Sequence, residues 1–81
     1  MVSSKYLSNP MDWDERIRVM EENLKDNYFN FLYFNIIVNM FDARDNADYD
    51  KEKILLNMLA AFNRGSFAGV GSLIGQLKEL V

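Results

Sequence analysis

The chain contains no cysteine and no histidine. Without cysteine it has no disulfide and no thiolate that could act as a nucleophile or a zinc ligand. Without histidine it lacks the commonest general base and the commonest protein ligand for transition metals. A chain of 81 residues also has little room for a substrate cleft beside a hydrophobic core. We therefore expect a protein that is not an enzyme and that holds no metal or cofactor.

Long hydrophobic runs are also missing. The longest apolar stretch spans residues 28–41 and includes three asparagines, whereas a membrane-spanning helix needs about 20 mostly apolar residues. Residues 1–8 carry one positive charge and no apolar run, unlike a secretory signal. The net charge of −3 disfavours binding to nucleic-acid phosphates, which requires clustered lysine and arginine. We expect a cytoplasmic protein with no membrane segment and no direct contact with nucleic acid.

What the chain does contain is typical of a globular domain, with 49% hydrophobic and 26% charged residues. Apolar residues recur at helical spacing. The only proline follows Asn9, and this Asn–Pro pair is a typical signal for the start of a helix. The pattern predicts an all-α fold, a compact bundle of three to four helices with the first two either separate or continuous. The expected helices span about 10–26, 28–41, 50–63 and 67–80. Residues 10–81 are expected to form one domain, after a flexible N-terminal segment at 1–9.

The segment from Asn27 to Phe41 carries no charge and is rich in aromatic residues. Its aromatic and β-branched residues leave a two-strand alternative open. However, no glycine or proline interrupts the run, and 15 residues are too many for one ordinary strand. We therefore predict a helix that is apolar nearly all round.

Such a helix must be covered on every side, and a domain of this size buries only about 60% of its unfolded surface. Exposed apolar surface of this kind usually marks an interface. We expect self-association, most simply as a two-fold dimer. The residues predicted to mediate it are Tyr28, Phe29, Phe31, Tyr33 and Phe34.

An acidic loop is expected between the second and third helices, over residues 42–50. A calcium-binding EF-hand is excluded because Lys51 or Lys53 falls where that loop requires glycine. Two interpretations remain, a solvated loop that caps a helix and a surface for a partner protein. Residues 12–26 carry a net charge of −3, as do residues 42–52. The residues predicted to bind a partner are Asp42, Asp45, Asp48, Tyr49, Asp50, Glu52, Asp14, Glu21 and Glu22.

The last helix contains glycine at positions 69, 71 and 75. Their spacing does not match a nucleotide-binding fingerprint, and no lysine follows as in a phosphate-binding loop. Glycine weakens a helix by about 1 kcal/mol per residue, so we expect another helix to approach closely at these positions. Leu80 is predicted to be the last core residue of this helix.

Together these features predict a small acidic interaction protein that acts as an inhibitor or adaptor. Its expected partner is a protein with a basic surface, because complementary charge speeds encounter and aids specificity. In size and charge alone the chain is similar to immunity proteins that neutralise nucleases and to phage-encoded inhibitors. One alternative is a self-assembling structural subunit. Another is a binder of a small ligand or cyclic nucleotide in a pocket between subunits.

Overall fold

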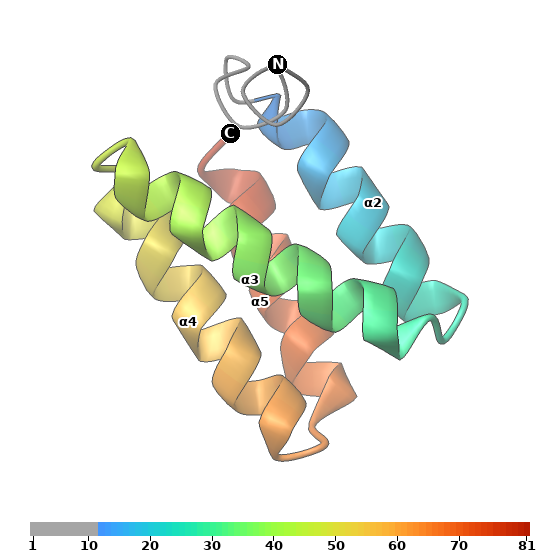
Figure 1. The fold of residues 1–81 in the computed structure, drawn as a ribbon. Helices are drawn as coiled ribbons and strands as arrows, with labels where there is room; N and C mark the ends of the chain where they lie inside the picture. Colours follow the sequence, from blue (N-terminus) through green and yellow to red (C-terminus); the bar gives the residue numbers. More distant parts are fainter. Residues whose placement is uncertain (1–11) are drawn as a thin grey trace.

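A computed structural model describes residues 12–81, and these residues form four helices (Figure 1). They are α2 (Trp13–Lys25), α3 (Phe29–Asp45), α4 (Tyr49–Asn63) and α5 (Phe67–Glu79). The described residues contain no strand, which confirms the all-α prediction and excludes the two-strand alternative for residues 28–41. None of these helices is long and apolar enough to cross a lipid bilayer.

A turn at residues 26–28 separates α2 from α3, so of the two alternatives left open for the first two helices the separate one holds. The predicted end of the second helix differs from the structure. Helix α3 then runs to Asp45, four residues beyond the predicted end, and the first part of the expected acidic loop is helical. The helix continues because Asp42 and Ala43 are buried, so packing overrides the local preference of aspartate for turns.

The start of α2 is set by Asp12, whose carboxylate Oδ1 accepts a hydrogen bond of 3.2 Å from the backbone N–H of Glu15. This is the N-cap arrangement expected of aspartate at a helix start. The predicted cap at Asn9 and Pro10 and the predicted flexible segment at 1–9 lie outside the described residues.

The helices form a closed ring in which each one packs against two others. Helix α2 contacts α3 and α5, and α4 contacts the same two helices. Figure 1 shows α3 crossing in front, α5 behind, and α2 and α4 on either side. Successive helices run in opposite directions, so the α3–α4 turn and the start of α2 lie at one end of the bundle and the other two turns at the opposite end.

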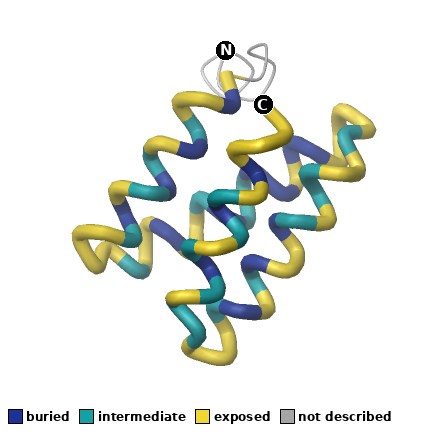
Figure 2. The backbone as a smooth tube through the Cα atoms, turned by 180° about the vertical axis from the view of Figure 1, so that it is seen from behind, coloured by how far each residue is buried: buried dark blue, intermediate teal, exposed yellow. Residues whose placement is uncertain are grey.

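The core is built from every helix, and buried positions follow the inner side of each one (Figure 2). The fully buried large side chains are Ile17, Met20, Leu32, Ile36, Leu55, Met58, Val70, Ile74 and Leu77. Leu80 does not belong to this core, contrary to the sequence prediction. Helix α5 ends at Glu79, and the Leu80 side chain is 45% exposed.

The three turns between helices have the same backbone geometry although their sequences differ. In each, the second of three linking residues has a positive φ, and the next N–H bonds to a carbonyl in the last turn of the preceding helix. This is a Schellman ending. The left-handed residues are Asn27 (φ 60°), Ala47 (φ 57°) and Gly65 (φ 75°). Only Gly65 reaches this conformation without a Cβ that crowds the backbone.

Replacing Ala47 with glycine is therefore expected to stabilise the fold by about 0.5–1 kcal/mol, because it removes the crowded Cβ from the left-handed position. Urea unfolding followed by the fluorescence of Trp13, the only tryptophan, measures the effect. The matched change Gly65→Ala should destabilise by a similar amount. A loss of stability in Ala47→Gly would contradict the strain assigned to Ala47.

The glycines of α5 do not all lie in close contacts. A Cβ at Gly69 would meet the Ser66 hydroxyl at 2.8 Å, and one at Gly71 would meet Leu24 at 3.5 Å. Nothing lies within 4 Å of a Cβ at Gly75. The expected close approach of another helix thus does not account for Gly75.

Gly75→Ala is expected to stabilise the protein by about 1 kcal/mol, because alanine is the better helix former and the new methyl group meets no neighbour. The same urea titration measures it. Gly69→Ala is the comparison, and it should gain less because the Ser66 side chain must move. Equal gains at both positions would show that the space around Gly69 is not limiting.

Candidate functional site

A buried polar cluster joins α2 to α3. The Arg16 guanidinium donates from Nη1 to Asn39 Oδ1 and to Asp42 Oδ2, both at 2.6 Å. The Asp42 side chain is 5% exposed and that of Arg16 is 16% exposed. Asn39 in turn donates from Nδ2 to the sulfur of Met20 at 3.6 Å. Because a buried charge requires a partner, this cluster ties the relative position of the two helices to a specific set of contacts.

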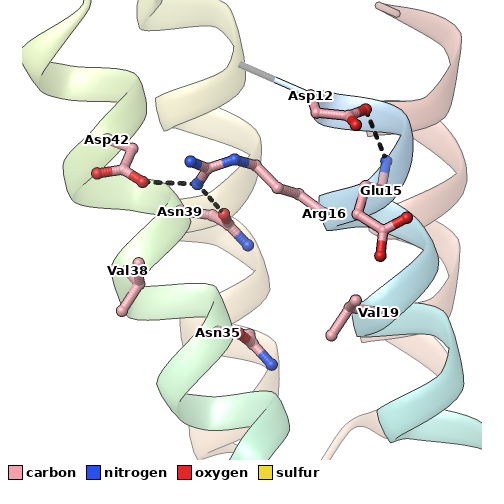
Figure 3. Close-up of a pocket in the computed structure, with 8 residues that line it drawn as sticks. All are labelled: Asp12, Glu15, Arg16, Val19, Asn35, Val38, Asn39 and Asp42. Atoms are coloured by element: carbon pink, nitrogen blue, oxygen red, sulfur yellow. Dashed lines mark hydrogen bonds and ion pairs between the residues drawn. The ribbon is translucent and has the colours of Figure 1, made fainter. Parts of the chain in front are cut away.

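Beside this cluster, a groove of about 260 Å³ opens between α2 and α3 (Figure 3). Val19 and Val38 line its apolar part, and Arg16 reaches across it from α2 to α3. Asp12 and Glu15 are both exposed on the α2 side. The complete lining is Asp12, Glu15, Arg16, Val19, Asn35, Val38, Asn39 and Asp42. Of its three carboxylates, Asp42 pairs with Arg16 and Glu15 pairs with Arg18. The Asp12 carboxylate has no ion pair within residues 12–81, so the groove keeps a net negative charge that attracts a cationic group.

The structure also brings the two acidic sequence blocks together. The Arg16–Asp42 pair places the first half of α2 beside the last turns of α3. Lys51, in the first turn of α4, has its Nζ 5.5 Å from the centre of the Trp13 ring, which begins α2. The start of α2, the end of α3 and the start of α4 therefore meet at one end of the bundle. We call this the acidic end, formed by Asp12, Asp14, Glu15, Asp45, Asp48, Asp50 and Glu52.

Of the acids predicted to bind a partner, most are engaged with a cation of the same chain. Asp42 is buried with Arg16, so it is not part of the exposed surface. The other ion pairs join Asp48 to Lys51, Glu52 to Arg44, Glu21 to Lys78 and Glu22 to Arg18. Glu21 and Glu22 lie in the second half of α2, away from the acidic end. Within residues 12–81, no ion pair engages the exposed Asp14, Asp45 or Asp50, and Tyr49 beside Asp50 is 66% exposed.

On the surface of α2, Arg18 lies between two glutamates one turn away on either side. Its hydrogen bond to Glu15, together with the charges of Glu15 and Glu22, raises the pKa of Arg18 above its ordinary value. The arginine stays charged at any physiological pH in either case. Arg18 therefore partly neutralises two carboxylates, that of Glu15 at the edge of the groove and that of Glu22 beyond it.

The aromatic residues of α3 divide between two sides of the helix. Phe29 is half-buried and stacks on Phe67 with ring centres 4.4 Å apart, so it belongs to the interior. Tyr33 is partly exposed and contacts the Phe62 ring at 5.3 Å. Phe31 and Phe34 are 64% and 61% exposed, and Tyr28 packs edge-on against Phe31. Three of the five residues predicted for self-association, Tyr28, Phe31 and Phe34, thus have more than half of their surface exposed.

Phe41 extends this exposed row by two more turns and is 47% exposed. Phe41 was not among the five residues predicted for self-association. Positions 31, 34, 38 and 41 follow helical spacing, so the sequence pattern could have indicated it. We call Phe31, Phe34, Val38 and Phe41 the outer face of α3. Arg16 and Asn39 were also missed. No local pattern marks them, because their partners lie 23 to 26 positions away in the chain.

Comparison with known proteins identifies no relative. The chain matches no protein-family model, no curated protein and no solved structure. Among residues 12–81, no cluster of three acidic side chains has a geometry that could hold a metal ion. The groove, the acidic end and the outer face of α3 are therefore the structural features that bear on function.

Removing the buried carboxylate by Asp42→Ala is expected to destabilise the fold by about 3 kcal/mol, because the Arg16 charge is left without its partner in a poorly solvated site. Chemical unfolding monitored by circular dichroism measures the loss. Glu22→Ala breaks an exposed pair and serves as the control, with an expected loss below about 1 kcal/mol.

Replacing both partners, as in Arg16→Met with Asp42→Leu, should restore much of the stability lost by Asp42→Ala alone. If Asp42→Ala costs no more than Glu22→Ala, the cluster does not hold α2 against α3 in the way described.

Proposed function

We propose that this protein is a non-catalytic interaction module that docks on a basic surface of another protein and acts there as an inhibitor or adaptor. The observation that carries the proposal is the convergence of two acidic sequence blocks at one end of a small bundle. At this end Asp14, Asp45 and Asp50 are exposed, and no cation among the described residues engages them. Because no cation of the described residues engages them, these carboxylates are available to form ion pairs with a basic partner.

The groove between α2 and α3 supports the same proposal. Its negative field and its apolar valines suit a lysine or arginine side chain, whose aliphatic stem packs on apolar surface while its charged head meets carboxylates. Asp12 and Glu15 stand at its edge beside the acidic end. A partner that places one basic side chain in the groove and others against Asp45 and Asp50 would use both features together.

The alternatives fit less of the site. The net negative charge of the groove disfavours a nucleotide phosphate at this place. A self-assembling subunit is favoured by a different observation, the exposed outer face of α3. This face shares Val38 with the groove, whereas the exposed Asp14, Asp45 and Asp50 are not part of it. A stable subunit can present its acidic end to another protein while its outer face is covered.

The proposal is tested by neutralising the exposed acids in Asp45→Asn with Asp50→Asn. The tagged protein is used to capture partners from a lysate of its source cell, and captured proteins are quantified by mass spectrometry. We expect the main captured protein to fall by about fivefold or more, because each exposed charge contact contributes up to about 1 kcal/mol. The same loss should follow when salt is raised, since screening weakens exposed charge pairs.

The matched control is Glu22→Asn with Asp26→Asn, which changes the net charge equally at positions away from the acidic end. It should capture the same protein as the unmodified chain. The captured partner is then purified and its affinity for all three proteins is measured by calorimetry. Equal affinity for the acidic-end variant and the control would overturn the proposal.

A further inference from the structure

The outer face of α3 is a row of mostly aromatic residues that no other helix within residues 12–81 covers. Phe31, Phe34 and Phe41 are each exposed by about half or more. No charged residue occurs between positions 27 and 41. A small soluble domain rarely leaves such a row in water, because removing each aromatic ring from solvent lowers the free energy.

We infer that this face binds a second copy of the same chain, with the two α3 helices crossing antiparallel about a two-fold axis near residue 36. The spacing of the row supports a second copy over a different protein. Its positions 31, 34, 38 and 41 are separated by three, four and three residues, so the row is unchanged when its direction is reversed. A two-fold axis then places Phe31 level with the partner's Phe41, and Phe34 level with the partner's Val38.

Charge selects the antiparallel direction. Four carboxylates of the acidic end, Asp45, Asp48, Asp50 and Glu52, follow the C-terminal part of the row, while the α2–α3 turn at its other end holds one lysine and one aspartate. A parallel pair would bring the two acidic ends side by side, where like charges repel. An antiparallel pair keeps them at opposite ends of the dimer.

The area of the row is sufficient for a dimer of moderate affinity. A Phe or Tyr side chain presents about 200 Å², so Tyr28 and the three phenylalanines offer about 450 Å² per chain at their observed exposure. Two copies bury about 900 Å² from these rings, and bordering residues bring the total to the lower end of specific interfaces. We expect a dissociation constant on the order of micromolar.

The test is the mass of the isolated protein by sedimentation equilibrium between about 1 and 300 μM, a range that brackets the expected affinity. The unmodified chain should shift from its 9.5 kDa monomer to twice that mass. Phe34→Lys should remain monomeric, with dimer affinity reduced by a hundredfold or more, because the axis places two charges in an apolar contact. The control Tyr49→Lys changes an equally exposed aromatic residue on α4 and should dimerise as before.

Orientation is tested with spin labels, which attach to a single site because the chain has no cysteine. A label on Asp45→Cys lies nine residues from the axis, so two labels should be about 30 Å apart in the antiparallel dimer and about 10 Å apart in a parallel one. The inference is overturned by a monomer at every concentration, by an intact dimer in Phe34→Lys, or by the shorter label distance.

This inference does not rest on the proposed docking of a basic protein. The acidic-end variant Asp45→Asn with Asp50→Asn should dimerise like the unmodified chain, and the dimer should persist at a salt concentration that weakens partner capture. Failure of one proposal is therefore visible without failure of the other.

Discussion

The ion pair between Arg16 and Asp42 is the contact on which the arrangement of the molecule depends. It is buried between α2 and α3, and Asn39 accepts a second hydrogen bond from the same guanidinium nitrogen. A buried charge is tolerated only where its partner is held in place, so this contact restricts how the two helices slide or rotate against each other. The groove beside the pair, and the approach of the two acidic blocks, follow from that restricted geometry.

Helix α3 performs several tasks because its sides differ. One side supplies Leu32 and Ile36 to the core, and the side toward α2 supplies Asn39 and Asp42 to the polar cluster. The remaining outer face is apolar and uncharged. The same helix therefore holds the bundle together and leaves a row of rings available for another chain. Val38 belongs both to this row and to the groove, whereas the exposed Asp14, Asp45 and Asp50 are not part of the row. Partner docking and self-association therefore share one residue and otherwise use different ones.

Much of this arrangement was predictable from local patterns. The helical type and the range of three to four helices followed from apolar periodicity. The predictions failed where long-range packing prevailed. Asp42 was predicted to lie in a loop. It extends α3 instead, because its carboxylate forms a buried ion pair with Arg16 of α2. Ala47 adopts a left-handed conformation that its residue type does not indicate, because the packed helices on either side require the turn to close there.

The sequence by itself determined that the chain is helical, that it is acidic, and that one helix is aromatic and uncharged, since these are properties of composition and short-range spacing. Only the tertiary structure decided which acids are buried, which are paired and which remain exposed. It also decided that Phe29 lies inside while Phe31, Phe34 and Phe41 lie outside. The physical reason is that burial and pairing are relations between residues distant in the chain, and they exist only once the helices have packed.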